Sequence, residues 1–131
     1  MSANGALTLS EVRPRAAAAL APASDGDPPV FVDYPEAVDV PCLVVIWDDP
    51  WLTFRTSCYW DAEMSVLAVA GRVETGPGIE TLEALAGYTI GRLRADRYSW
   101  AQSSSQAPRE IMIGGVPYLA ARVNYRVAVT I

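Results

Sequence analysis

Hydrophobic and polar residues alternate along the end of the chain, in the stretch GGVPYLAARVNYRVAVTI at 114–131. Successive side chains of a β-strand point to opposite faces, so this period of two predicts one long strand. Its apolar face carries Leu119, Ala121, Val123, Tyr125, Val127, Val129 and Ile131, and its other face carries Ala120, Arg122, Asn124, Arg126, Ala128 and Thr130. Because strands usually have about 5 to 6 residues, we expect this one to be a long edge strand whose polar face is used by something else.

Two earlier apolar stretches also predict strands. The run CLVVIW at 42–47 lies between Pro41 and Pro50, and each proline removes a ladder donor, so we expect the strand to stop there and Asp48-Asp49-Pro50 to form an acidic turn. The stretch 58–73 alternates in its first half and is apolar on both faces in its second, which indicates a strand that runs from an edge into a covered position. Gly114-Gly115, between REIMI and the final strand, is typical of a hairpin turn.

Helical spacing occurs at two places. Apolar residues three, four and seven positions apart predict the main helix at 79–95, with the stripe Ile79, Leu82, Leu85, Ala86, Thr89, Ile90 and Leu93. Near the N-terminus, Thr8 and Glu11 have the spacing of a capping box and precede a second apolar stripe, although Pro14 tolerates only the first turn of a helix.

These elements predict an α+β, sandwich-like fold with the order α-β-β-α-β-β. Its sheet would be mostly antiparallel and of about four strands, with the 79–95 helix packed across it and an N-terminal helix beside it. The whole chain, 1–131, is expected to be a single domain with a flexible N-terminus at 1–6, an extended linker at 21–41 and a polar loop at 98–108.

Composition narrows the function. Hydrophobic residues make up 51% of the chain and charged residues 19%, which indicates a folded protein. All ten basic residues are arginine, so no histidine or lysine is present for general-base, Schiff-base or imidazole-ligand chemistry. The net charge of -5 argues against sequence-independent DNA binding, and no apolar run reaches the ~20 residues that cross a bilayer. Cys42 and Cys58 fit no zinc spacing and are expected as buried free thiols.

Carboxylates are the remaining catalytic candidates. Asp48 with Asp49, and Asp61 with Glu63, leave a carboxylate-dependent hydrolase open by residue type. A turn for the first pair and solvated or ion-paired strand positions for the second are the simpler interpretations. We therefore expect no catalytic residue, no cofactor and no metal ligand.

Tryptophan and arginine offer contact surfaces. The four tryptophans either pack in the core or contact a neighbouring subunit, and Trp51 and Trp100, in predicted loops, are the better interface candidates. Arg122 and Arg126 are either solvated or form part of an interface.

The runs SEVRPRAAAALA, PEAVDVPCLVVIW, CYWDAEMSVLAVAGR followed by GIETLEALAGYTIGRLR, and IMIGGVPYLAARVNYRVAVTI together resemble the small tail terminator (tail-completion) proteins of long-tailed bacteriophages, especially those of actinobacterial hosts. The resemblance covers nearly the whole chain from about residue 7 and includes no catalytic motif. It implies an α/β protein without enzymatic activity, whose copies form a ring, usually a hexamer, that caps the tail tube.

The partners implied are further copies of the chain, the tail tube protein and the head-completion (stopper) protein. The protein would be assembled in the host cytoplasm and reside in the virion at the head-tail junction, with DNA passing through the ring without specific binding and with no membrane contact. Because ring subunits need adhesive surfaces, we expect interface residues among Arg122, Asn124, Arg126, Glu80, Glu83, Asp61, Glu63, Trp51 and Trp100. The alternatives are another neck or head-tail adaptor component, and a small-molecule binding module that uses the tryptophans.

Overall fold

The computed structural model describes residues 7–33, 35–36, 38–72, 78–98 and 100–130. The expected flexible N-terminus at 1–6 lies outside these residues. In chain order the described elements are β1 (Leu7–Thr8), a 3-10 turn η2 (Leu9–Glu11), α1 (Val12–Leu20), β2 (Val30–Val32), β3 (Cys42–Phe54), β4 (Trp60–Arg72), α2 (Gly78–Ala95), β5 (Ala101–Ser105), β6 (Arg109–Ile113) and β7 (Val116–Thr130).

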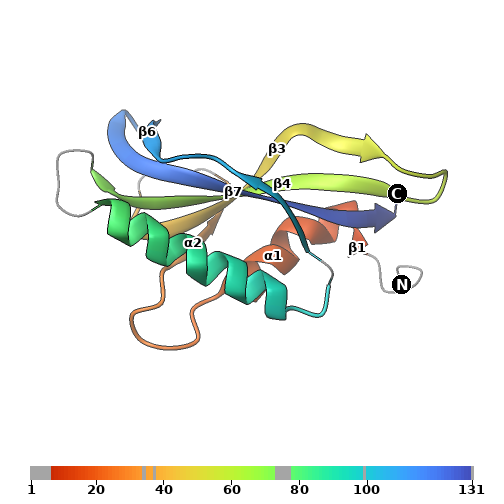
Figure 1. The fold of residues 1–131 in the computed structure, drawn as a ribbon, viewed down its shortest axis with the longest axis horizontal. Coiled ribbons are helices and arrows are strands. Elements are labelled where there is room, and N and C mark those ends of the chain that lie inside the picture. Colours follow the sequence, from red (N-terminus) through yellow and green to blue (C-terminus); the bar gives the residue numbers. More distant parts are fainter. Residues whose placement is uncertain (1–6, 34, 37, 73–77, 99, 131) are drawn as a thin grey trace.

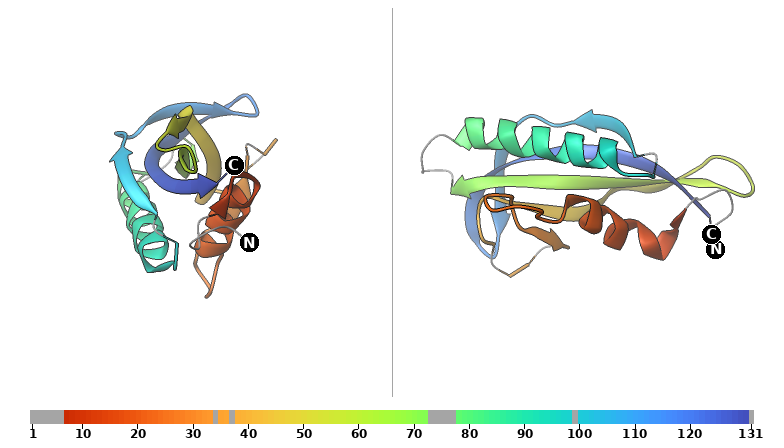
Figure 2. Two further views of the ribbon diagram at one scale, coloured as in Figure 1. Left: turned by 90° about the vertical axis from the view of Figure 1, so that its right-hand side faces the viewer. Right: turned by 90° about the horizontal axis from the view of Figure 1, so that it is seen from below.

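The described strands form one mixed, seven-stranded sheet in the order β1-β7-β4-β3-β2, with β5 and β6 also paired to β7. β1 runs parallel to β7 and β2 runs parallel to β3, whereas the other pairs are antiparallel. The sheet is strongly coiled, and α1 and α2 lie next to each other on its outer face (Figures 1 and 2). At one end of the molecule the β3–β4 turn extends past both helices (Figure 1).

The expected four-stranded sheet with the order α-β-β-α-β-β is therefore wrong. β1 and β2 have two and three residues, too few to show a period, and they are strands only because β7 and β3 lie beside them. β5 has the polar sequence AQSSS and forms in the segment expected as a loop at 98–108. The expected linker at 21–41 contains β2, whose pairing continues with a hydrogen bond from the Asp33 N–H to the Val45 carbonyl (3.0 Å).

β3 continues through Pro50 instead of ending before it. The pairing of β3 with β4 shifts register between Trp47 and Leu52, so the residue without an N–H falls in an irregular part of the ladder. Asp48 and Asp49 accordingly belong to a strand, and the prediction of an acidic turn there was wrong.

β7 is not an edge strand. Its residues 118–129 pair with β4 on one side, and β1, β5 and β6 occupy its other side. β7 exceeds the usual strand length because β6, β5 and β1 pair with successive parts of it.

The alternation expected for the final strand is confirmed within β7, and Ile131 lies outside the described residues. Val123, Tyr125 and Val127 lie in the main core between sheet and helices, and Ala120 and Tyr118 lie in a smaller apolar cluster on the opposite, inner face. Both faces of β4 are buried from Asp61 to Val69, so the sheet carries a core on each side.

The helices follow their sequence signals closely. α2 confirms the helix expected at 79–95, and Leu82, Leu85, Thr89 and Leu93 are its buried stripe. Glu11 accepts hydrogen bonds from the Thr8 N–H (2.8 Å) and hydroxyl (2.7 Å), which confirms the capping box, although the first turn is 3-10 and α1 follows it. Gly114 and Gly115 form the expected hairpin turn with φ of 58° and 79°, values that favour glycine.

Candidate functional site

A strip of polar side chains crosses the inner face of the sheet, next to the smaller apolar cluster. It consists of Asp48 from β3, Asp61, Glu63 and Ser65 from β4, and Arg122, Asn124 and Arg126 from β7, and is called the polar strip here. The strands bring these residues together because Glu63 pairs in register with Arg126, and Ser65 with Asn124. Sequence alternation had placed the β4 and β7 residues on one face of each strand, but it could not align the strands, and Asp48 was expected in a turn.

Every carboxylate of the polar strip meets an arginine of the same chain. The Arg126 Nε lies 3.2 Å from both carboxylate oxygens of Glu63. Arg122 approaches Asp48 at 3.9 Å, and Arg55 approaches Asp61 at 3.5 Å. Between them, the Ser65 hydroxyl donates to the Asn124 side-chain oxygen at 2.7 Å.

Asp61 and Glu63 of the strip are buried, whereas Asp48 and the arginines are at least partly exposed. The Glu63 side chain is 8% exposed, whereas the Arg126 side chain above it is 49% exposed. A buried carboxylate is tolerated where a cation compensates it. The arginine and carboxylate groups that we expected to meet across subunits thus meet inside one chain, and the strip is a set of ion pairs that ties β3, β4 and β7 together.

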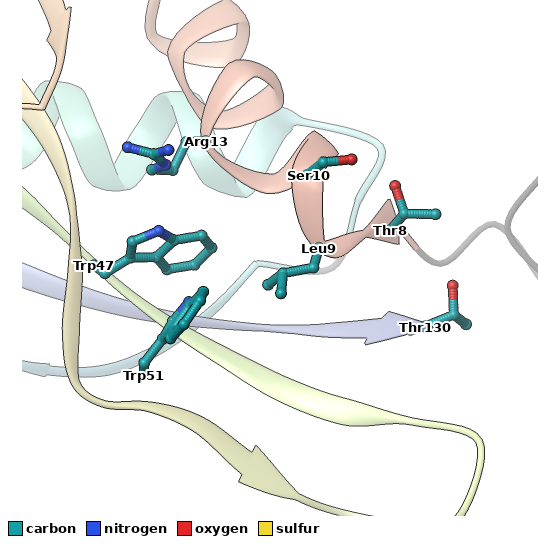
Figure 3. Close-up of a pocket in the computed structure, with 7 residues that line it drawn as sticks. All are labelled: Thr8, Leu9, Ser10, Arg13, Trp47, Trp51 and Thr130. Atoms are coloured by element: carbon teal, nitrogen blue, oxygen red, sulfur yellow. The ribbon is translucent and has the colours of Figure 1, made fainter.

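An open groove lies on the other face of the sheet, between η2 and β3. Its lining comprises Thr8, Leu9, Ser10, Arg13, Trp47, Trp51 and Thr130, and its volume is about 480 Å³ (Figure 3). The two indole rings lie 5.5 Å apart at 50° to each other, and the Arg13 guanidinium lies 5.6 Å from the Trp47 ring. Arg13 also pairs with Asp33, so its charge is already compensated.

The groove is suited to an apolar or aromatic group. Trp51 is 47% exposed, and Leu9 and Trp47 line the groove beside it (Figure 3). The structure thus places the candidate Trp51 at an accessible surface.

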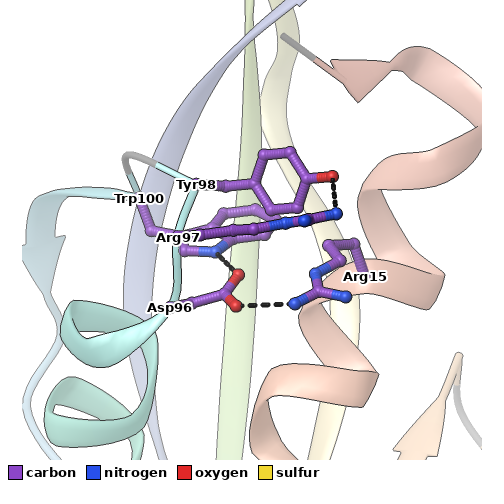
Figure 4. A network of polar contacts seen from close by, with 5 residues as sticks. All are labelled: Arg15, Asp96, Arg97, Tyr98 and Trp100. Atoms are coloured by element: carbon purple, nitrogen blue, oxygen red, sulfur yellow. Dashed lines mark hydrogen bonds and ion pairs between the residues drawn. The ribbon is translucent and has the colours of Figure 1, made fainter. Parts of the chain in front are cut away.

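Trp100, the other tryptophan candidate, is buried in the chain at 7% exposure. Its Nε1 donates to Asp96 at 2.7 Å, and Arg15 of α1 donates to the other oxygen of Asp96 at 2.8 Å (Figure 4). Tyr98 lies under both Arg15 and Arg97, at 5.1 and 5.0 Å from the guanidinium carbons. Trp100 therefore joins α1 to the end of α2, and its ring is not presented to a neighbouring subunit.

Two opposing influences act on the pKa of Asp96. Burial raises it, but the hydrogen bonds from Arg15 and Trp100, with the charge of Arg15, outweigh burial, so the pKa is lowered. Asp96 therefore stays ionised at neutral pH and acts as the centre of this network. The sequence signal for this role, an aspartate directly after a helix, was too common to be singled out.

The remaining candidates lie on α2. Glu80 and Glu83 are exposed on its outer side, away from the polar strip and the groove. Sequence reasoning overlooked several exposed apolar side chains, and the most exposed of them are Phe54, Ile79 and Met112 at 61%, 52% and 61%. Ile79 was expected in the apolar stripe of the 79–95 helix, and that prediction was wrong. Met112 was expected only as part of the strand before the glycine turn.

The cysteines differ from each other. Cys42 is buried as expected, and burial raises the pKa of its thiol to about 11. Cys58 is exposed beside the β3–β4 turn, because β4 begins two residues later than expected, so the prediction of a second buried thiol was wrong.

Within the described ranges, no group of three or more histidine, cysteine or carboxylate residues is arranged to hold a metal ion. No helix in that part of the chain is long and apolar enough to span a membrane. The sequence matches no protein-family model, and no curated protein is significantly similar to it.

Proposed function

We propose that this protein is a structural subunit of the virion of a long-tailed bacteriophage, a tail terminator whose copies form a ring on the tail tube and join it to the neck. The sequence resemblance supports this proposal over nearly the whole chain. The alternative of a carboxylate-dependent hydrolase would need Asp61 and Glu63 in a cavity. Both residues instead pair with arginines in the sheet and do not line the groove, which favours a structural role.

The observation that carries the proposal is the projecting β3–β4 end. Trp51 and Phe54, both in β3, are 47% and 61% exposed, and the β3–β4 turn that follows extends past the helices (Figure 1). Aromatic residues are enriched in contact surfaces between proteins. A subunit that is always assembled gives these side chains a permanent partner.

The charge distribution fits a ring through which DNA slides. The net charge is -5, and the arginines Arg122 and Arg126 of β7 are paired with Asp48 and Glu63. Paired arginines attract phosphates less than free ones do. A ring whose channel is densely lined with unpaired arginine would contradict this part of the proposal.

Electron microscopy of the purified protein, and of phage particles labelled for it, tests the function. We expect the purified protein to form rings with six-fold symmetry, and we expect the phage particles to carry the label at the head-tail junction. Copurification with tails that lack heads would favour a terminator over an adaptor on the head side. Protein that remains a single copy and joins no virus particle would refute the proposal.

A small-molecule binding module is the second candidate, because the groove at Trp47 and Trp51 has a volume in the range of ligand pockets. This alternative predicts a monomer whose melting temperature rises with a ligand. A stable ring that shows no such shift across a library of aromatic compounds would exclude it.

A further inference from the structure

One side of α2 faces away from the rest of the described chain. The buried stripe of the helix packs on the sheet, and α1 lies along one flank (Figure 2). Residues opposite the buried stripe recur three and four positions apart and therefore share the outward side. This side, called the outer face here, consists of the exposed residues Glu80, Glu83, Ala84, Gly87, Gly91, Arg94 and Ala95.

The charges of the outer face are separated along the helix. Glu80 and Glu83 lie in its first half and Arg94 lies at its end, and none of the three forms an ion pair with another described residue. The helix dipole favours acids in the first turn and bases in the last turn, which does not account for Glu83 in the second turn. A face that changes from acidic to basic along its length is complementary to a copy of itself that runs in the opposite direction.

The spacing on the outer face fits two antiparallel copies of α2. When Gly87 of one copy lies opposite Gly91 of the other, Glu83 of each copy falls within one residue of Arg94 of the other. Arg94 follows Glu83 by about three helical turns, so both residues are on the same flank of the outer face. The unlike charges therefore meet twice in such a pair.

The middle of the outer face leaves room for this contact. Apart from the backbone of the helix itself, no atom lies within 4 Å of the position that a Cβ would take at Gly87 or Gly91. Ala84 and Ala95, on either side of the glycines, are also small. A second helix can therefore come close enough for the charged side chains at the two ends to reach each other.

The arginines near the acidic end of α2 point away from it. Arg109 is on the same face of β6 as Ile111 and Ile113, which belong to the smaller apolar cluster on the inner face of the sheet. Arg72 pairs with Tyr118 of the same cluster. Both arginines are thus on the opposite face of the sheet from α2 and do not neutralise Glu80 or Glu83.

Other charges on the helix side agree with the separation. Glu110 pairs with Leu119, which packs on the main core, so it adds a negative charge beside the acidic end. At the basic end Asp96 is already paired with Arg15. Arg97 follows the helix there, is exposed and forms no ion pair with another described residue.

The loop after α1 carries two further acids, Asp25 and Asp27. It meets α2 on the flank that α1 covers, where Arg92 donates to the Ala21 carbonyl and lies near Asp27. Arg92 and Arg94 are two residues apart and so point to different sides of the helix. The loop acids are therefore beside Arg92 and not beside Arg94.

We propose that α2 of one copy packs antiparallel on α2 of a second copy, with Gly87 opposite Gly91 and Glu83 beside Arg94 in both directions. Such a two-fold contact uses the same surface on both copies. It goes beyond the proposed function, because subunits within one ring are related by rotation about the ring axis and would use other surfaces. Exposed ion pairs contribute little, so the pair forms at high protein concentration and separates on dilution.

Charge reversal tests this register by sedimentation equilibrium. The parent protein carries Phe54→Asp, which removes an exposed aromatic residue of the β3–β4 end so that ring contacts do not interfere. The parent is expected to dimerise. Glu83→Arg or Arg94→Glu, added singly, places like charges together and is expected to lower the association constant about tenfold.

A mixture of the two variants distinguishes the contact from a general effect of charge. In a heterodimer of Glu83→Arg with Arg94→Glu, both ion pairs are restored with their signs exchanged. The equimolar mixture is therefore expected to associate like the parent. Arg109→Glu, a reversal on the opposite face of the sheet, is the matched control and should leave association unchanged. A parent that stays monomeric, single variants that associate like the parent, or a mixture no tighter than its components would overturn the inference.

Gly91→Leu tests the close approach of the two helices. The monomer has open space at this position, so the melting temperature of dilute protein should not fall. The larger side chain is expected to block the second helix and to lower the association constant at least about tenfold. Association at the parent level would overturn the contact.

The proposed function is tested separately from this contact. With Phe54 intact, Glu83→Arg is expected to form rings like the unmodified protein. Absence of rings from both proteins would refute the ring, and the association measurements would still decide the contact between helices. Loss of rings by Glu83→Arg alone would place Glu83 in the ring and overturn the two-fold contact.

Discussion

At the scale of single residues, ion pairs and one buried aspartate hold together segments that are distant in sequence. Asp96 accepts hydrogen bonds from Arg15 and Trp100, and Glu63 pairs with Arg126. Removal of one partner leaves a poorly solvated charge, which costs more than the intact pair contributes. These residues therefore link α1 to the end of α2 and β4 to β7.

The substitution Asp96→Asn should lower the free energy of unfolding at neutral pH by about 1 kcal/mol, the lower part of the usual range, because Arg15 is partly solvated. The pKa of Asp96 is lowered in the folded protein. Its contribution is complete above the ordinary pKa of aspartate and is lost as the pH falls through the lowered value. Urea unfolding over a pH series should show the difference between the two proteins shrinking toward acid. Asp25→Asn, at an exposed position, should show no such trend.

The substitution Arg126→Ala leaves the buried Glu63 carboxylate without its cation. We expect a loss of about 1–2 kcal/mol, kept small because half of the Arg126 side chain is in solvent. Arg55→Ala should cost far less, since its contact with Asp61 is longer and more exposed. Equal effects of the two substitutions in urea unfolding would show that burial of Glu63 is unimportant.

At the scale of elements, turns and helices follow local rules, and their glycines have separate roles. Gly114 turns the β6–β7 hairpin against the backbone at Glu36, whereas Gly87 and Gly91 lie on the open side of α2. Substitutions at these positions distinguish strain in a turn from conformational freedom in a helix.

Gly114→Ala should destabilise the protein more than Gly115→Ala. Both residues have positive φ, which costs an alanine about 1–2 kcal/mol. A Cβ at Gly114 would also overlap the Glu36 carbonyl oxygen, whereas none is near Gly115. Thermal unfolding of the pair measures the difference, and a larger loss at Gly115 would contradict the packing of this turn.

Gly87→Ala should stabilise the protein by about 0.5–1 kcal/mol, because glycine in a helix interior loses more conformational entropy than alanine. No atom lies within 4 Å of the position that the new Cβ would take. Gly78→Ala, where the Cβ would meet Leu119 at 2.6 Å, should bring no such gain. A drop in melting temperature for Gly87→Ala would indicate that this side of α2 is covered.

Helices and strands were predicted correctly from the sequence where the hydrophobic periodicity extended over enough residues. α2, the β6–β7 hairpin and the alternation of β7 were all predicted, because each depends on residues within one segment. The strands β1, β2 and β5 were missed, since two to five residues carry no clear period and are ordered by their neighbours. Pro50 was taken as a strand end, although an irregular register accommodates it.

At the scale of the whole molecule, the long paired strands β4 and β7 place the exposed Phe54 and Met112 near opposite ends of the sheet. The helices cover one face of the sheet and leave the β3–β4 end projecting (Figures 1 and 2). In the proposed ring, contact between copies would bury side chains that the monomer exposes and would stabilise the folded state.

The melting temperature of the protein should therefore rise with protein concentration, since association stabilises the folded state by mass action. Phe54→Asp should reduce this dependence, and the loss of the edge-on contact between Phe54 and Trp60 should lower the melting temperature of the dilute protein only slightly. Scanning calorimetry over a hundredfold range of concentration measures both effects. A concentration-independent melting temperature for the unmodified protein would argue against self-association.

The sequence by itself determined the local features: the helix at 79–95, the glycine turn, the faces of β7 and the absence of histidine and lysine. These depend on backbone preferences and side-chain periods within a few residues. Only the tertiary structure decided that β7 is central, that Glu63 meets Arg126, that Trp100 is buried and that Phe54 and Met112 are exposed. The register between strands, and the burial of each sheet face by other elements, arise from contacts between segments that are distant in the sequence. No local pattern contains that information.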